Sequence, residues 1–134
     1  MTETKSTIAI LGGPGALGGG LAWRWARAGY SVIVGSRTAD KGETAASELR
    51  EELGDVDVRG TDNATAAAEA EIVVLTVPFA HQLPTLQSVH EQVQGKILVD
   101  CTVPLVPPKV ARVQLPEEGS AGARAQRLLG EEVQ

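Results

Sequence analysis

Short apolar runs alternate with longer segments of helical composition along most of the chain. The runs are rich in Val, Ile and Leu and too short for helices, so we predict strands there and helices between them. Strands are expected at residues 7–11, 31–34, 56–59, 72–77 and 96–100, and helices at 15–28, 39–53, 63–69 and 81–92. The runs lack in/out alternation, which is typical of strands covered on both faces. This order predicts an α/β fold with a doubly wound parallel sheet of about five strands.

The pattern changes after residue 100. Residues 101–119 hold four of the seven prolines, which excludes a continuous helix and predicts an extended, Pro-rich loop. Residues 120–130 are expected to contain a C-terminal helix rich in Ala, Leu and Arg. The 134 residues fit one domain, residues 1–134, with residues 7–100 as its core βαβ units. A further strand would be expected to follow, so we predict a sheet that is one strand short.

Charge and composition argue against several kinds of partner. The chain has 12 Lys and Arg against 17 Asp and Glu, a net charge of −5, and no basic block, so nucleic acid is not an expected partner. Residues 7–23 are uncharged but contain six glycines, which is typical of neither a signal peptide nor a membrane span. The single cysteine, Cys101, cannot form an intramolecular disulfide, and such low cysteine usage fits a cytoplasmic protein.

Gly13, Gly15 and Gly18 have the spacing G-x-G-x-x-G where the first strand is followed by a helix. Inside a βαβ unit, this spacing is typical of a turn that binds the pyrophosphate of a dinucleotide. Gly13 is expected to permit the tight turn, Gly15 to let the main chain approach the phosphates, and Gly18 to let helix and strand pack closely. Because Pro14 has no N–H, the predicted donors are the amides of residues 15–17. The alternative is a glycine-rich turn without a ligand.

The residues after the second strand favour NADP over NAD. About twenty residues after the glycines, an NAD site usually offers Asp or Glu to the ribose 2′-hydroxyl. This chain has Gly35, Ser36 and Arg37 there, with Lys41 one turn into the next helix. A hydroxyl, a guanidinium and an ammonium suit a 2′-phosphate dianion, so we predict NADP(H) as the bound dinucleotide. The alternative is that Arg37 and Lys41 only solvate a helix start, where the dipole favours acidic residues.

The reacting end of such a ligand is expected outside the carboxyl ends of the first and fourth strands. Thr76, Pro78 and Phe79 follow the fourth strand, and Phe79 is predicted either to cover the nicotinamide side of the cleft or to cap the core. Residues 100–104 should form the opposite wall.

His81 and Cys101 are the two candidates for chemistry by a side chain. His81 could act as an acid or base near neutral pH, although a polar residue at a helix start is the more common role. Cys101 has no histidine nearby in sequence to activate it, so we expect a buried, inert thiol. No spacing typical of metal ligands or of an acyl-transfer nucleophile occurs.

Four motifs, in this order, resemble one family. Residues 10–18 (Ile-Leu-Gly-Gly-Pro-Gly-Ala-Leu-Gly), 35–37 (Gly-Ser-Arg), 75–78 (Leu-Thr-Val-Pro) and 99–105 (Val-Asp-Cys-Thr-Val-Pro-Leu) are similar to the NADPH-dependent reductases of the deazaflavin coenzyme F-420. The resemblance implies a Rossmann NAD(P)-binding fold and an oxidoreductase that transfers a hydride reversibly between NADPH and coenzyme F-420. Positioning two rings suffices for such a transfer, so no protein acid or base is required.

The resemblance also implies cofactor contacts, including Leu83 and Val103. With the residues selected above, the candidate cofactor-binding set is Gly13, Pro14, Gly15, Ala16, Leu17, Gly18, Ser36, Arg37, Lys41, Thr76, Pro78, Phe79, Leu83 and Val103. Family members place Thr where Pro14 stands, so one polar contact to the phosphates would be missing here. Members are also longer, and their second half supplies further strands, much of the deazaflavin pocket and the dimer contacts.

Three hypotheses follow for function. The first is a short or truncated NADPH-dependent coenzyme F-420 reductase. The second is a non-catalytic NADP(H)-binding or sensing module, and the third is a reductase of another acceptor, such as a flavin, an imine or a ferric ion, because fold does not fix function. A homodimer, or association through an open sheet edge, is expected because an unpaired edge is a template for pairing.

Overall fold

The computed structural model describes residues 5–108 and 110–134, and its strands form one five-stranded parallel sheet. The strands are β1 (Thr7–Leu11), β2 (Ser31–Ser36), β3 (Val58–Asp62), β4 (Ile72–Leu75) and β5 (Ile97–Asp100). Their order across the sheet is β3-β2-β1-β4-β5, and every neighbouring pair is parallel. The predicted doubly wound α/β fold is confirmed, and the direction of winding reverses between β1 and β4.

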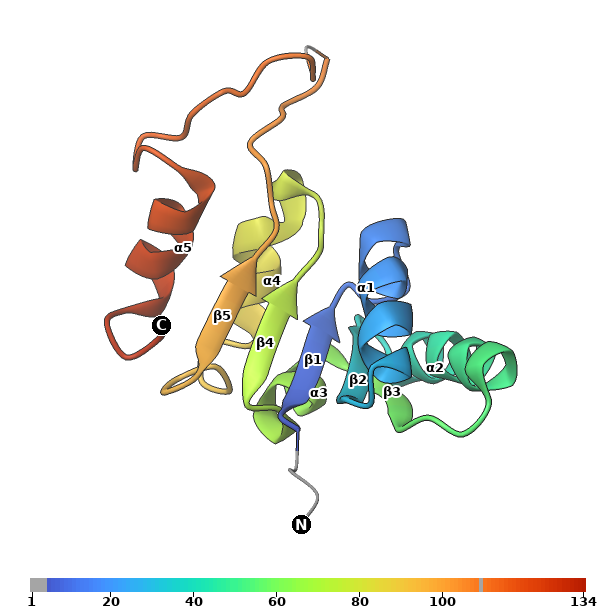
Figure 1. Ribbon diagram of the computed structural model, residues 1–134. Coiled ribbons are helices and arrows are strands. Elements are labelled where there is room, and N and C mark those ends of the chain that lie inside the picture. The colour runs from blue at the N-terminus through green and yellow to red at the C-terminus, as the bar shows by residue number, and fades with distance from the viewer. Residues whose placement is uncertain (1–4, 109) are drawn as a thin grey trace.

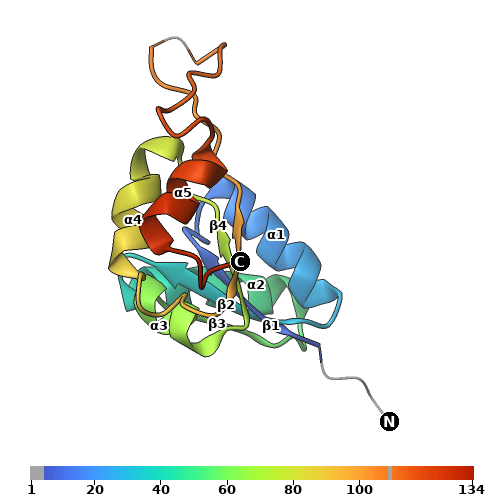
Figure 2. The same ribbon diagram turned by 90° about the vertical axis from the view of Figure 1, so that its left-hand side faces the viewer.

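Helices cover both faces of this sheet (Figure 1). They are α1 (Ala16–Arg27), α2 (Ala39–Leu53), α3 (Asn63–Glu69), α4 (Gln82–Ser88) and α5 (Ala121–Leu129), with a short 3-10 turn, η1 (Phe79–His81), before α4. Figure 2 shows α3, α4 and α5 on one side of the sheet and α1 on the other. The buried side chains of α1 and α2 share one core with the sheet, and those of α3 and α5 share the other.

Small residues allow the helices to pack closely on the strands. Buried alanines on α1, α2 and α3 pack against apolar strand residues. Ala22, Ala26 and Ala46 belong to the core on one face of the sheet, and Ala66 and Ala67 belong to the core on the other. Helix α2 approaches β3 most closely, because a Cβ atom on Gly60 would lie 1.9 Å from the carbonyl oxygen of Gly42. A glycine in each element is therefore what lets these two backbones touch.

Several element boundaries differ from the prediction for identifiable reasons. β3 covers residues 58–62 instead of 56–59, because its polar second half pairs along the backbone with the end of β2, up to Ser36 opposite Asp62. β4 ends at Leu75, two residues early, since both the amide and the hydroxyl of Thr76 donate to the Leu11 carbonyl, at 3.0 and 2.8 Å. α4 ends at Ser88 instead of residue 92.

The edge of β5 is partly paired, contrary to the expectation of an open edge. The amide of Gln134 donates to the carbonyl of Lys96 at 3.0 Å, and the amide of Leu98 donates to the carbonyl of Gln134 at 2.6 Å. This is the hydrogen-bond pattern of a parallel pair. On one face of β5, however, Ile97 and Val99 remain 46% and 44% exposed.

The described part of residues 101–119 is the predicted extended loop. It projects beyond the sheet in Figure 1 and contains one isolated antiparallel bridge, between Leu105 and Val113. Its apolar side chains are exposed, among them Val106, Val110 and Leu115. None of the described helices combines the length and the apolar composition that crossing a membrane requires.

Candidate functional site

A cleft of about 650 Å³ lies at the carboxyl edge of the sheet, over the switch point between β1 and β4. It is lined by residues that follow β1, β2, β3 and β4 and by one side of α4: Gly12, Pro14, Gly15, Ser36, Arg37, Lys41, Asn63, Thr76, Val77, Pro78, His81, Pro84, Thr85 and Ser88. The volume suits a small-molecule ligand, and parallel α/β sheets bind their ligands at this place.

The glycine-rich turn is held to the end of β2 by its own backbone. The amides of Gly12 and Gly13 both donate to the Gly35 carbonyl, at 3.1 and 3.0 Å. Gly12, which precedes the motif, has the positive φ of +79° that makes the turn. At Gly13 a Cβ atom would lie 2.6 Å from a methyl carbon of Val34. The tight turn therefore depends on Gly12, whereas Gly13 provides the close approach to β2.

The other two glycines place the start of α1. A Cβ atom on Gly18 would lie 2.7 Å from the hydroxyl of Thr76 and 2.8 Å from Cα of Gly13, so the predicted close packing of helix and strand at Gly18 is confirmed. The amide of Gly15 donates to the Gly12 carbonyl at 3.1 Å. This bond engages the Gly15 amide inside the turn, whereas the amides of Ala16 and Leu17 belong to the first turn of α1 and have no acceptor within their own helix, so phosphate binding by the amides of residues 15–17 stays a prediction.

The residues of this turn fit the pyrophosphate of a dinucleotide. Gly15 is the N-cap of α1, no side chain caps the helix, and its first turn holds no acidic residue. The N-terminal amides and the positive end of the helix dipole are thus available to an anion. Pro14 and Gly15 line the cleft, and at neither position does a large side chain obstruct it.

Ser36, Arg37 and Lys41 all line the cleft, and their binding of a 2′-phosphate stays a prediction. Ser36 is the last residue of β2 and is buried, with 8% of its surface exposed, while Arg37 and Lys41 are exposed. Thr38 caps α2 by accepting a hydrogen bond from the Lys41 amide at 3.4 Å, which places the lysine one turn beyond the strand. The lining of the cleft therefore includes a hydroxyl and two cations, which are groups that suit a phosphate.

The cleft also contains residues that the sequence analysis did not select. Asn63 begins α3, directly after β3. Residues 100–104, which were expected to form the opposite wall, do not line the cleft, and one side of α4 does so instead, where His81, Pro84, Thr85 and Ser88 follow each other at helical spacing. The sequence does indicate this wall: the four residues are short and mostly uncharged, and their spacing of i, i+3, i+4 and i+7 places them on one face of a helix.

The other predicted contacts lie around the cleft in different ways. Thr76 and Pro78 line it, but the Thr76 hydroxyl already donates to the Leu11 carbonyl, so it joins the ends of β1 and β4. The half-buried ring of Phe79 packs against the Arg124 guanidinium, 4.3 Å from the ring centroid, and does not line the cleft. Leu83 is half-buried outside the cleft, and Val103 is 50% exposed in the loop after β5.

The described part of the chain contains neither an activated thiol nor a cluster of metal-ligating side chains. Burial, with a smaller contribution from the neighbouring Asp100 carboxylate, raises the pKa of the Cys101 thiol, so little thiolate forms near neutral pH. Cys101 is only half-buried, slightly more accessible than expected. Among the described residues, no group of three or more His, Cys, Asp or Glu side chains could hold a metal ion.

Comparisons with known proteins show the family to which the chain belongs. Residues 7–104 match the family model described as "NADP oxidoreductase coenzyme F420-dependent". The F420-dependent NADP reductase of Methanothermobacter thermautotrophicus is 47% identical over 130 residues, which cover 93% of this chain and 56% of that protein. The reductase of the same name from Methanocaldococcus jannaschii is 38% identical, over 92% of this chain and 58% of that protein. The chain thus spans a little over half the length of these relatives.

Solved structures place the fold in the same group. An Arthrobacter sp. FB24 protein, provisionally assigned as an F420-dependent NADP reductase, is 31% identical, with a TM-score of 0.76 over 94% of this chain and 60% of its own. A pyrroline-5-carboxylate reductase from Coxiella burnetii shares the fold alone, at 19% identity and a TM-score of 0.63 over 96% of this chain and 41% of its own. Because the family model matches 98 of the 134 residues (7–104), the chain belongs to the family of coenzyme F420-dependent NADP oxidoreductases.

Proposed function

We propose that this protein is an NADP-dependent oxidoreductase that transfers a hydride between NADPH and the deazaflavin coenzyme F-420. The observation that carries the proposal is the meeting of Ser36, Arg37 and Lys41 in the same cleft as an uncapped helix N-terminus. These groups suit the 2′-phosphate and the pyrophosphate of NADP(H), and the family match supports coenzyme F-420 as the second substrate.

The chain's own residues would hold NADP(H) along the carboxyl edge of the sheet. The amides of Ala16 and Leu17 would bind the pyrophosphate, while Gly13, Gly15 and Gly18 keep the turn close to β2 and β4. When bound, NADPH supplies the hydride that the deazaflavin ring accepts. Thr76 and Pro78 shape the cleft beyond the pyrophosphate, and we assign Phe79, Leu83 and Val103 to the surroundings of the reacting ring.

Catalysis in this proposal is positioning, because a hydride passes directly between two stacked rings. The protein therefore has to fix the dinucleotide and exclude alternative poses. His81 lines the cleft at the start of α4, next to the uncharged wall of that helix, and we assign it no proton transfer.

We further propose that residues 1–134 form one NADP-binding domain, that the protein is cytoplasmic and that it forms a homodimer. The support for self-association is the exposed apolar pair Ile97 and Val99 on β5, since such side chains in a contiguous patch mark interaction surfaces. Sedimentation velocity over a hundredfold range of concentration tests it, and a constant monomeric coefficient would contradict the homodimer.

The direct test of function is reduction of coenzyme F-420 by the purified chain, followed by deazaflavin absorbance, with NADPH and NADH in parallel. We expect turnover with NADPH and little with NADH. Binding of both dinucleotides is measured on the same sample. NADPH binding without turnover would instead support the binding-module hypothesis, and turnover only with a flavin, an imine or a ferric ion would support another acceptor.

A further inference from the structure

Asn63 contributes a polar group to the cleft that the binding of phosphates does not use. Its side chain lines the cleft, yet its Oδ1 atom has almost no accessible surface and, within residues 5–108 and 110–134, no hydrogen-bond partner. Buried polar atoms are nearly always hydrogen-bonded in native proteins, so each exception requires an explanation. Because Oδ1 has no partner where it lies, the carboxamide loses no hydrogen bond if it turns toward a ligand in the cleft.

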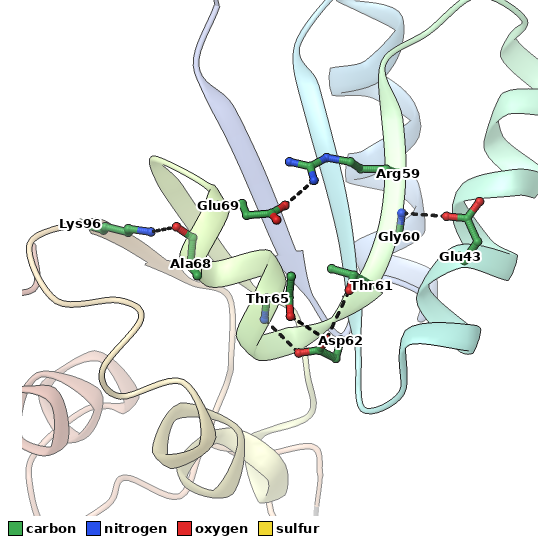
Figure 3. Close-up of polar contacts among 9 residues, drawn as sticks. All are labelled: Glu43, Arg59, Gly60, Thr61, Asp62, Thr65, Ala68, Glu69 and Lys96. Carbon is green, nitrogen blue, oxygen red and sulfur yellow. Dashed lines mark hydrogen bonds and ion pairs between the residues drawn. The ribbon is translucent and has the colours of Figure 1, made fainter.

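The backbone of Asn63 is fixed from both ends of α3. Asp62, the N-cap, accepts hydrogen bonds from the Thr65 amide at 2.9 Å and from the Thr65 hydroxyl at 2.7 Å (Figure 3). At the other end, the Lys96 ammonium donates to the carbonyls of Ala67 and Ala68, at 2.5 and 2.8 Å. The first residue of α3 is therefore held at one place beside the cleft.

The space for the carboxamide is made by Gly35. A Cβ atom on Gly35 would lie 2.8 Å from Asn63 Oδ1, so any other residue there would push the side chain away. The carbonyl of Gly35 also accepts the amides of Gly12 and Gly13. One glycine at the end of β2 thus fixes the phosphate turn through its backbone and leaves room for the carboxamide over its Cα.

A cation and a carboxamide reach the cleft from opposite faces of the sheet. Lys41 comes from α2, on one face, whereas Asn63 comes from α3, on the other face with α4. Pro84 and Thr85, which also line the cleft, belong to α4. A neutral carboxamide, which carries one acceptor and one donor group, does not suit a dianion that already has two cations.

We propose that Asn63 recognises the adenine base of the dinucleotide and so determines specificity for adenine over other bases. Asn pairs with adenine through two hydrogen bonds, its oxygen accepting from the exocyclic amine and its nitrogen donating to a ring nitrogen. Pro84 offers an apolar surface for the ring. Only a turn of the carboxamide is required, and this torsion of Asn is broad. The inference rests on the proposed binding of NADP(H).

The test compares NADPH with its hypoxanthine analogue, in which an oxygen replaces the amine of the base. Dissociation constants are measured by fluorescence titration of the full chain, without the second substrate. The wild type should bind NADPH about tenfold more tightly than the analogue. Asn63→Ala should reduce this ratio to about one while leaving the ratio of NADPH to NADH affinities unchanged.

Thr65→Ala is the matched control, because it loosens the first turn of α3 without altering a residue that lines the cleft. An equal loss of base discrimination in Thr65→Ala would show a merely structural role for Asn63 and overturn the inference. Equal binding of both bases by the wild type, with NADPH still bound, would also overturn it. A wild type that binds neither dinucleotide would contradict the proposed function itself. If Asn63→Ala does not fold, Asn63→Ser provides the same comparison.

Discussion

The two edges of the sheet are built in opposite ways. On the side of β2 and β3, short polar residues are set by backbone contacts: Ser36 ends a strand, Thr38 and Asp62 cap helices, and Gly42 touches Gly60. On the side of β5, Ile97 and Val99 are about half exposed, and the loop that follows carries further exposed apolar side chains. The first edge positions polar groups, and the second exposes apolar surface.

This difference separates the choice of dinucleotide from the choice of acceptor. The groups assigned to NADP(H) are positioned by strand register and helix caps, which are local and rigid. Val103, which we assign to the surroundings of the reacting ring, lies in a loop. Substitutions in a loop can change what a protein binds without altering the scaffold of helices and strands. Substitutions on the two sides should therefore have different consequences.

The largest effect is expected where α2 meets β3. Gly60→Ala places a Cβ atom 1.9 Å from the Gly42 carbonyl oxygen, so α2 must move away from the sheet. We expect a loss of about 3 kcal/mol in the free energy of unfolding, the upper end for overpacking, and weaker NADPH binding because Lys41 lies on α2. Chemical denaturation and fluorescence titration measure the two effects.

Gly122→Ala is the control for that substitution. The residue is exposed on α5, and the nearest atom to an added Cβ, outside its own helix, is the Ser120 hydroxyl at 3.9 Å. Alanine should stabilise this helix by about 0.5 kcal/mol. A loss of less than 1 kcal/mol in Gly60→Ala would show that the β2–β3 side is not rigid, and the comparison would fail.

Arg37→Ala tests the charged end of the cleft directly. Removing the guanidinium should weaken NADPH binding by about 1.5 to 3 kcal/mol, the value of a charge-assisted hydrogen bond, and leave NADH binding nearly unchanged. Arg59→Ala removes the same charge from an exposed pair with Glu69, outside the cleft, and should change neither affinity by more than a few tenths of a kcal/mol. Equal losses for both dinucleotides in Arg37→Ala would refute the 2′-phosphate assignment.

The sequence predicted much of this side, and its failures have physical causes. The strand and helix order, the glycine motif and the group Ser36, Arg37 and Lys41 follow from apolar runs and residue chemistry. Asn63 was correctly expected to begin a helix, but it was not selected for the site because β3 was expected to end at residue 59. The second half of β3 is polar, and only backbone pairing with β2 reveals that the strand continues to Asp62. A helix start that directly follows a strand at the carboxyl edge of the sheet is not recognised when the end of that strand is misplaced.

The roles inside the glycine turn were also only partly predictable. Spacing identifies Gly13, Gly15 and Gly18, but a backbone amide gives no sequence signal of its partner. The bond from the Gly15 amide to the Gly12 carbonyl depends on the positive φ of Gly12, which lies outside the motif. The exposure of β5 likewise depends on which helices reach it, so the apolar run of that strand predicts burial that the structure does not have on one face.

Asp62→Ala should have a smaller effect, on the cap of α3. Loss of an N-cap costs about 1 kcal/mol. The amide and hydroxyl of Thr65 hold the pKa of the Asp62 carboxyl below its ordinary value, so the folded state favours the ionised form. Its contribution to stability is therefore present above the ordinary pKa of Asp and lost as the pH falls through the lowered pKa of the folded state.

Asp62→Asn is the matched variant, because an asparagine still caps the helix but does not titrate. Denaturation curves from pH 3 to pH 7 give the free energy of unfolding of each variant. The wild type should be more stable than Asp62→Ala near neutral pH and lose this difference in acid, whereas the difference in stability between Asp62→Asn and Asp62→Ala should not depend on pH. A pH-independent difference between the wild type and Asp62→Ala would contradict the assigned cap.

The smallest effect on the monomer is expected at β5. Val99→Thr keeps the β-branched shape, and at 44% exposure the new hydroxyl reaches water, so the free energy of unfolding at low concentration should change by less than about 0.5 kcal/mol. The same substitution at the fully buried Val73 leaves a hydroxyl without water and should cost about 1 to 3 kcal/mol in the free energy of unfolding.

Sedimentation at high concentration tests whether Val99 contributes to self-association. The proposed homodimer should dissociate more readily in Val99→Thr than in the wild type. An unchanged dimer would place its interface elsewhere, and a large loss in the dilute monomer would show that this face of β5 is covered after all.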